Sequence, residues 1–195
     1  TISEEKTLNI SLLLEGLYEG PGTMRKAQGA SGAQYPGTVA DQVTVELHEA
    51  GNYGNVVYAA SNVDLNINGT AGLTIPAALN GSYYITIRHR NSLETVSSDP
   101  VSFISGVITY GFDQPLQVYG GNLKLIPTGE YAIFGGDVNQ DGAVDTADMT
   151  PVDNDTGNYS SGYLVTDVNG DGIVDTGDMT IVDNNAAGFT GAVTP

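Results

Sequence analysis

The residues best suited to chemistry lie in two copies of one acidic motif near the C-terminal end of the sequence. The first copy runs from Asp137 to Asp148 and the second from Asp167 to Asp178, thirty residues later. Extended to the following Val-Asp-Asn, the copies are identical at 14 of 18 positions. A repeat this close indicates two duplicated structural units.

Each copy has the spacing of a calcium-binding loop, with oxygen-bearing side chains at positions 1, 3, 5, 9 and 12 and glycine at position 6. Ca²⁺ takes roughly six to eight oxygen ligands, and the glycine permits a sharp turn. Position 7 contributes its backbone carbonyl, and position 9 binds directly or through a water. The predicted ligands are Asp137, Asn139, Asp141, Ala143, Asp145 and Asp148 in loop one, and Asp167, Asn169, Asp171, Ile173, Asp175 and Asp178 in loop two.

The charge distribution singles out the same segment. Residues 137–195 contain 11 Asp and no Glu, Lys or Arg, a net charge of −11, whereas residues 1–136 contain 12 acidic and 6 basic residues, a net charge of −6. Because uncompensated carboxylates oppose compaction, we expect this tail to fold only with two structural Ca²⁺ ions bound. The overall net charge of −17 argues against nucleic acid as a partner.

A short helix is predicted after each loop, beginning at about Thr146 and Thr176, with Asp145 and Asp175 as N-caps. Pro151 is expected to limit the first helix to one or two turns. The stretch before loop one is β-like and ends in two glycines, so no helix is expected to enter that loop.

Two loops of the form D-x-N-x-D-G-x-V-D-x-x-D, each followed but not preceded by a helix, resemble type I dockerins. These are calcium-dependent modules that attach secreted polysaccharide-degrading enzymes to cohesin-bearing scaffolds. The resemblance covers about residues 135–187. It implies that loop positions 10 and 11, with the adjoining helix face, contact a cohesin-like protein. Those positions are Thr146, Ala147, Thr176 and Gly177.

The larger N-terminal part has the pattern of β structure. Apolar residues alternate over 43–47, 63–67 and 83–87, and Gly-rich or Pro-containing turns separate these runs. We expect seven to nine short strands and an immunoglobulin-like or prealbumin-like β-sandwich over residues 1–134. The chain is therefore predicted to be mainly β, with a short Gly135–Gly136 link and a small α dockerin-like module over residues 135–195.

Catalysis is not expected in this chain. It has no Cys, no Gly-x-Ser-x-Gly motif and no Gly-rich phosphate loop. Its two histidines, His48 and His89, lie in strand patterns and are interpreted as surface or structural residues. Arg88-His89-Arg90 holds two of the six basic residues at a strand end. This cluster is either a solvated strand terminus or a docking point for the acidic tail or an anionic sugar.

Tyrosines offer a second possible binding surface. Tyr83 and Tyr84, together with Tyr53 and Tyr58, would form a sugar-stacking platform if they shared a face. Alternation along a strand places Tyr83 and Tyr84 on opposite faces, so one of them is expected in the core. The absence of Trp disfavours the sugar-binding interpretation.

Two broader resemblances concern the whole chain. The order of short segments resembles the C-terminal regions of large secreted proteins of Bacteroidetes-type bacteria. The segments are Thr23-Met-Arg-Lys-Ala27, Ala40-Asp41, His89-Arg-Asn-Ser-Leu-Glu-Thr95, Tyr119-Gly120 and Gly136-Asp-Val-Asn-Gln-Asp-Gly142. A small sandwich before the loops is also similar to the X module–dockerin pairs of cellulosomal proteins, in which the sandwich stabilises the dockerin.

These resemblances imply a non-catalytic, calcium-stabilised module of a larger exported protein, secreted or on a bacterial cell surface. We expect it to serve polysaccharide degradation through a cohesin–dockerin-type contact, without membrane insertion. Alternatively, it is a carbohydrate-binding or cell-surface adhesion module whose tail is a calcium-clamped cap. A dockerin exposes its helix surfaces to a partner, whereas a cap buries them on the sandwich. The first residue is Thr1 rather than Met, which suggests a piece of a longer protein.

Overall fold

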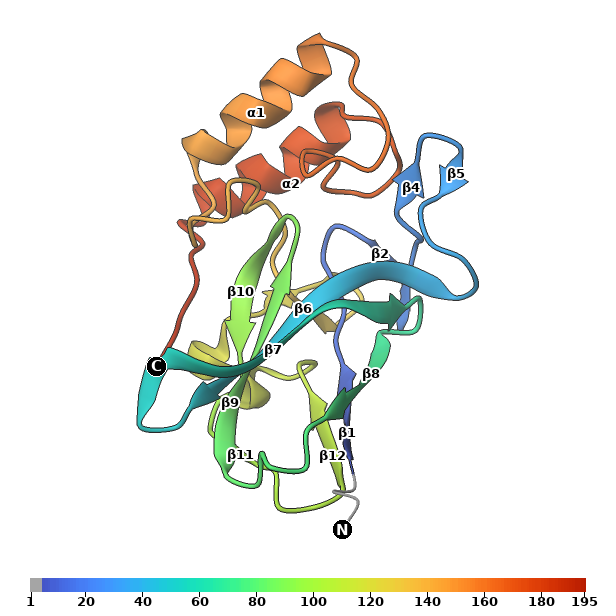
Figure 1. The fold of residues 1–195 in the computed structure, drawn as a ribbon. Helices are drawn as coiled ribbons and strands as arrows, with labels where there is room; N and C mark the ends of the chain where they lie inside the picture. Colours follow the sequence, from blue (N-terminus) through green and yellow to red (C-terminus); the bar gives the residue numbers. More distant parts are fainter. Residues whose placement is uncertain (1–4) are drawn as a thin grey trace.

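The computed structural model describes residues 5–195, so the first four residues of the predicted 1–134 sandwich lie outside it (Figure 1). The described part contains fourteen strands, two 3₁₀ helices and two α-helices. They are β1 (Lys6–Ser11), β2 (Tyr18–Gly20), β3 (Thr23–Met24), β4 (Gln28–Gly29), β5 (Gly32–Ala33), β6 (Val39–Glu49), β7 (Asn52–Asn66), β8 (Thr70–Ile75), β9 (Ser82–His89), β10 (Ser92–Val96), β11 (Val101–Ser102), β12 (Val107–Gly111), η1 (Pro115–Gln117), η2 (Tyr119–Gly121), β13 (Lys124–Leu125), β14 (Tyr131–Ala132), α1 (Thr146–Gly157) and α2 (Thr176–Ala187).

The β part is a sandwich of two main sheets. One sheet has the order β12-β1-β8, with β1 parallel to β12 and antiparallel to β8. The other has the order β10-β9-β6-β7, and β11 adds to β9. A single apolar core draws on both sheets, as with Leu8 of β1, Val45 of β6 and Ile85 of β9, all fully buried. The mainly β prediction is confirmed.

Alternating side chains explain these strands. Along β1 buried and outward-facing residues alternate, with Leu8 and Ile10 in the core and Thr7 and Asn9 exposed, which gives the period of two that a half-buried strand requires. Seven strands have five or more residues, in line with the seven to nine expected. The other seven have two or three residues, too few for a sequence period to reveal them; six form three local pairs, and β11 adds to β9.

The two α-helices lie together beyond the tip of the β9–β10 hairpin (Figure 1). Each has 12 residues and begins directly after a loop. The prediction that Pro151 would restrict α1 to one or two turns was wrong. Pro151 removes only the hydrogen bond to the carbonyl of Ala147 in the exposed first turn, while a capping box and the buried Val152 hold the helix around it.

The helical part has an apolar cluster that it does not complete by itself. Its buried members are six valines from its loops and helices and one larger side chain, Leu93, which comes from β10 of the sandwich. The backbone N–H of Leu93 also donates to the carbonyl of Phe134, at 2.9 Å. The valines are Val138, Val144, Val152, Val168, Val174 and Val182. The hairpin is thus part of the core of both units.

The Gly135–Gly136 link is held on both sides by the sandwich. The N–H of Gly135 donates to Glu15 at 3.0 Å, and the N–H of Gly136 donates to the carbonyl of Asn91 at 2.8 Å. Neither helix of the described part combines the length and the apolar composition needed to cross a membrane.

Leu93→Ala should destabilise the chain by about 2–5 kcal/mol, because it leaves a cavity where the sandwich contributes a fully buried side chain to the helical cluster. Urea unfolding in calcium, followed by far-ultraviolet circular dichroism, measures the effect. Leu116→Ala is the matched control, since Leu116 is 92% exposed and its loss should change stability by less than about 0.5 kcal/mol. Equal losses for both variants would show that the hairpin does not support the helices.

Candidate calcium loops and the junction that holds them

The two predicted loops have the same local geometry. In each, the N–H of position 5 donates to the Asn at position 3 at 2.8 Å, and the N–H of the position 6 glycine donates to the Asp at position 1 at 3.1–3.2 Å. Gly142 and Gly172 have φ of +88° and +85°, a left-handed conformation that favours glycine. The duplicated sequence therefore forms duplicated structure.

The Asp at position 12 organises each loop. Asp148 is fully buried, and its carboxylate accepts from the N–H groups of Val138, Asn139 and Asp145, at 2.7, 3.0 and 3.0 Å. Asp178 likewise accepts from Asn169 and Asp175, both at 2.9 Å. These bonds tie the start of each loop to the N-terminus of its helix. The predicted N-caps Asp145 and Asp175 are confirmed, each in a complete capping box.

The Asp at position 1 carries the clearest electrostatic signal. Asp137 and Asp167 are buried, and the Oδ1 atom of each has no hydrogen-bond partner. Burial, with the charge of Asp148 beside it, raises the pKa of Asp137 to about 6. Burial also raises the pKa of Asp167 to about 6, although the charge of Arg90 opposes the rise. A buried carboxylate oxygen without a hydrogen-bond partner, present in each loop, is suited to act as a ligand of a cation.

The remaining predicted ligands line the outside of the loops. Positions 5 and 9 are exposed in both copies, and short β-bridges join Ala143 to Gly191 and Ile173 to Ser161. Within residues 5–195, no three His, Asp or Glu side chains have the arrangement of a metal-binding cluster. Calcium would therefore require each loop to draw its oxygens together. The loops fit the ion through their donor sets and unpaired oxygens, since each carboxylate oxygen that accepts an N–H retains a second lone pair.

The four predicted partner positions are all on the surface. Thr146, Ala147, Thr176 and Gly177 are exposed at the N-terminal ends of α1 and α2. The most exposed large apolar side chains on this unit are Tyr159 and Phe189, which follow the two helices.

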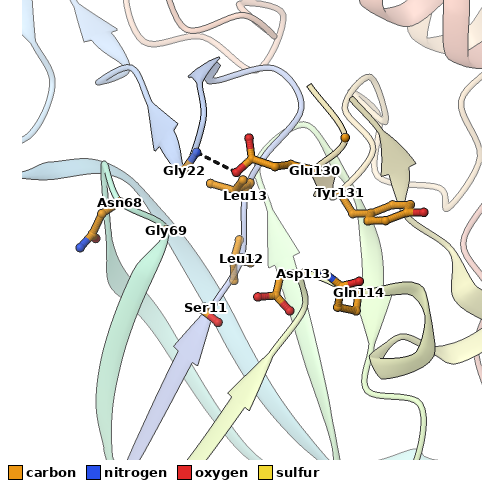
Figure 2. A pocket seen from close by; sticks show the side chains of 11 residues that line it. Ser11, Leu12, Leu13, Gly22, Asn68, Gly69, Asp113, Gln114, Glu130 and Tyr131 are labelled. Carbon is orange, nitrogen blue, oxygen red and sulfur yellow. Dashed lines mark hydrogen bonds between the residues drawn. The ribbon is translucent and has the colours of Figure 1, made fainter. Parts of the chain in front are cut away.

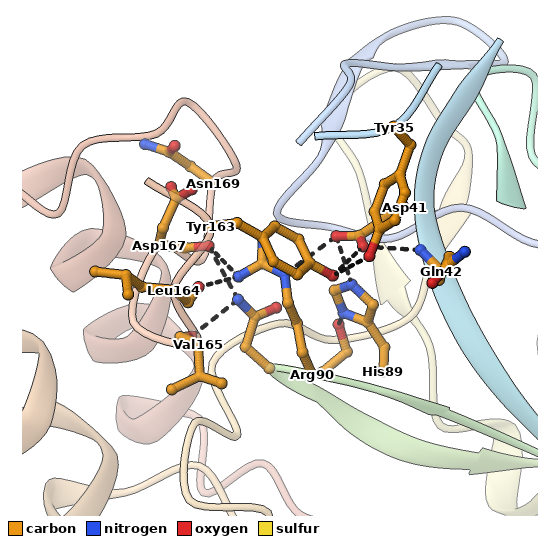
Figure 3. Close-up of polar contacts among 12 residues, drawn as sticks. Tyr35, Asp41, Gln42, His89, Arg90, Tyr163, Leu164, Val165, Asp167 and Asn169 are labelled. Carbon is orange, nitrogen blue, oxygen red and sulfur yellow. Dashed lines mark hydrogen bonds and ion pairs between the residues drawn. The ribbon is translucent and has the colours of Figure 1, made fainter. Parts of the chain in front are cut away.

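The sandwich grips loop two through the turn of the β9–β10 hairpin (Figure 3). The Nη1 of Arg90 donates to the carbonyl oxygens of Leu164 and, at 2.8 Å, of Asp167. The Nδ2 of Asn91 donates at 3.0 Å to the carbonyl oxygens of Val165 and Asp167. The basic cluster Arg88-His89-Arg90 was expected to be either a solvated strand end or a docking point. Its Arg90 is a docking point for the acidic tail. Arg88 instead pairs with Glu46 and Glu94, both at 2.9 Å.

A buried network holds Arg90 in place. The Oδ2 of Asp41 lies 3.1 Å from both Nε of Arg90 and Nε2 of His89, and the hydroxyl of Tyr163 donates to Oδ1 at 2.5 Å. The Tyr163 ring stacks on the guanidinium, 4.5 Å from its centre. Burial alone would raise the pKa of Asp41, but the hydrogen bond from His89 and the neighbouring positive charge hold it well below its usual range.

His89 is structural, one of the two roles predicted from its strand position. Because Asp41 only accepts, Nε2 of His89 carries the hydrogen, and Nδ1 lies 2.8 Å from Oγ of Ser92. Burial lowers the pKa of His89, although the hydrogen bond that its Nε2 donates to Asp41 opposes this shift. The Asp41–His89–Ser92 order is that of a hydrolase triad, but all three side chains are buried. His48, the other histidine, is buried and stacks on Tyr53.

A second contact anchors α2. Asn185 is buried, and its Nδ2 donates to Glu15 at 2.6 Å and to the carbonyl of Gly135 at 2.8 Å. Lys124 donates to the Oδ1 of Asn185 at 2.8 Å and lies 3.3 Å from Glu15. The sequence analysis missed Asn185, Glu15 and Asn91, because a single uncharged or acidic residue has no pattern that distinguishes a docking contact.

The tyrosines of the predicted sugar platform do not share one face. Tyr83 packs on Phe103 in the core, as alternation predicted, while Tyr53, Tyr84 and Tyr119 pack edge to face in a row.

A pocket of about 240 Å³ beyond the end of β1 includes Asp113 and Glu130 (Figure 2). Glu130 accepts from the N–H of Gly22 at 2.8 Å and from the hydroxyl of Tyr18, so it closes a turn.

Comparison with known proteins gives a likeness of fold. No family model matches the chain, and no curated protein matches it. A solved structure of an N-terminal interface mutant of a type II cohesin–X-dockerin complex from Acetivibrio cellulolyticus is 16% identical, with a TM-score of 0.52, and the match covers 92% of this chain and 94% of that one. A C-terminal interface mutant of the same complex gives 16% identity, the same coverage and a TM-score of 0.48. The first match shows a shared fold and supports the sandwich assignment.

His89 should make stability depend on pH between 7 and 5. Its folded pKa lies below its unfolded value of about 6.5, so the unfolded chain binds more protons and stability falls as the pH drops below 6.5. Urea unfolding at both pH values should show that the free energy of unfolding of His89→Gln falls less steeply with pH than that of the wild type. The difference in slope should be up to about 1.4 kcal/mol per pH unit. His48→Gln, which retains His89, should keep that part of the slope. Parallel slopes for wild type and His89→Gln would contradict this account.

Proposed function

We propose that this chain is a non-catalytic, calcium-binding attachment module of an exported bacterial protein. In this proposal the helical unit binds a cohesin-type partner when its two loops hold Ca²⁺, and the sandwich keeps that unit in its binding geometry. The observation that carries the proposal is the pairing of two equivalent loops. Each combines a buried, unsatisfied oxygen on its first Asp with an exposed pair of residues at positions 10 and 11.

The charge of the tail supports calcium as the ion. Residues 137–195 carry 11 carboxylates and no basic side chain, and both loops supply only oxygen donors. Hard oxygen ligands in a flexible loop suit Ca²⁺, while the absence of Cys and His from the loops disfavours zinc. Once bound, the ions would supply positive charge at the loops and fix the helix N-termini that carry the partner positions.

The exposed positions support a protein partner. Thr146, Ala147, Thr176 and Gly177 project from two helices whose buried faces are already used by the apolar cluster and by Asn185. The surface around them is acidic, so a complementary partner would be basic at its rim. The likeness of fold to a chain from a cohesin–X-dockerin complex agrees with this class of partner.

A second candidate function is an internal clamp, and specific contacts favour it. Leu93, Arg90 and Asn91 of the sandwich enter the helical unit, and Asn185 of α2 binds back to the sandwich. Calcium in the loops would then stabilise the whole chain. The clamp and the attachment role are compatible, because Asn91, Leu93 and Asn185 of the junction are buried and the partner positions are exposed.

Calcium titration tests the ion assignment. Calorimetry at pH 7 should show two ions per chain, and Asp141→Ala should leave one. At pH 4.5 the affinity should fall by about tenfold or more, because protonation removes the charge that ligation requires. Asp153→Ala, which removes an equally exposed carboxylate from α1, should leave both sites intact. Equal affinity at the two pH values, or two sites in Asp141→Ala, would refute carboxylate ligation.

Retention of a partner tests the attachment role. The immobilised chain, exposed to the secreted and surface proteins of the source organism, should retain one protein in calcium and release it in chelator. The double variant Thr146→Arg/Thr176→Arg should lose this retention by at least about tenfold. Thr109→Arg, an equally exposed change on β12, should keep it. Retention by the double variant would place the partner surface elsewhere, and no retained protein would favour the internal clamp.

A further inference from the structure

The two loops differ at position 4, and this difference changes how each is held. Position 4 is Gln140 in loop one and Gly170 in loop two. The Nε2 of Gln140 donates at 2.5 Å to the carbonyl of Asp137, the first residue of its own loop, and at 3.2 Å to that of Ser92. Loop one therefore supplies a donor for its own first carbonyl.

Loop two has no side chain with which to do the same. A Cβ at Gly170 would clash with the side chain of Leu17, and the φ of +70° also favours glycine. The first carbonyl of this loop, that of Asp167, accepts instead from Asn91 at 3.0 Å and from Arg90 at 2.8 Å. A third tie joins the sandwich to the same loop, since the N–H of Gln28 donates to the carbonyl of Gly170 at 3.0 Å.

We infer that Asn91 and Arg90 are positioning residues for calcium at loop two, and that the sandwich completes this site, whereas loop one supplies the corresponding donor itself through Gln140. The inference rests on the proposed calcium function. Asn91 is buried and is aimed at the backbone of Asp167, whose side chain supplies the unsatisfied Oδ1. Groups that orient a ligand from behind typically change metal affinity by about 10–100-fold when removed.

A coupling between calcium and docking follows from this geometry. If the docked hairpin raises the affinity of loop two, then calcium at loop two must stabilise docking by the same factor. Loop one lacks this link through its first carbonyl, because its donor belongs to the helical unit. Calcium binding is therefore coupled to docking of the sandwich at loop two.

The test separates the two sites before perturbing either. Asp171→Ala disables loop two and leaves loop one, and Asp141→Ala disables loop one and leaves loop two. Asn91→Ala, and Asn91→Leu of similar size, are placed in each background. Gln140→Gly is the matched control, because it copies the loop-two residue into loop one. Calorimetry with calcium chloride on the full chain gives each affinity, and far-ultraviolet circular dichroism in calcium checks the fold.

The expected result is a crossed pattern. Asn91→Ala and Asn91→Leu should weaken loop two by about tenfold and leave loop one within about twofold, whereas Gln140→Gly should weaken loop one alone. If both backgrounds bind calcium and neither Asn91 variant affects loop two more than loop one, the inference is overturned while the calcium function stands. If neither background nor the unmodified chain binds calcium, the proposed function itself fails.

Discussion

The turn of the β9–β10 hairpin is the contact on which the rest of the molecule depends. Leu93 joins six valines as the buried residues of the helical cluster, and Arg90 and Asn91 donate to backbone oxygens just before and at the start of loop two. A unit of this size rarely gathers enough apolar surface to fold alone, and such units usually rely on a metal, a disulfide or a partner surface. This chain has no Cys, so the hairpin is the support that the structure shows, and the proposed calcium ions would be a second one.

The electrostatics of the helical unit follow from its lack of basic residues. Asp148 and Asp178 are satisfied by backbone N–H groups, and the positive charge of Arg90 from the sandwich opposes the rise in the pKa of Asp167. These interactions leave the Oδ1 atoms of Asp137 and Asp167 unsatisfied. An unpaired buried carboxylate is expensive, so its occurrence at the same position in both copies argues for a cation rather than for a local imperfection.

Local features of this fold were readable from the sequence, and long-range contacts were not. The repeated loops, the Asp145 and Asp175 caps and the alternating strands depend on neighbours within a few residues, and the structure confirms them. The prediction of a short α1 was wrong because it considered only the backbone hydrogen bond that Pro151 lacks. It left out the buried packing of Val152, which favours continuation of the helix. The contacts of Asn91 with Val165 and of Asn185 with Glu15 span 74 and 170 residues, and no periodicity records such pairs. Arg90 was recognisable as a candidate only because cations are scarce.

The differences between the two copies reflect docking on one side. The sandwich contacts the two loop–helix copies differently, so the copies must differ in sequence where they touch it. Gly170 lies against Leu17 where loop one has an exposed Gln140, and Ile181 packs near Gly135 where α1 has Pro151. Positions needed by both loops, the Asp at 1, 5, 9 and 12 and the Gly at 6, are unchanged. The identities between the copies therefore mark what an ion would require of each loop, and the departures at positions 4 and 15 mark what the sandwich requires of loop two and α2.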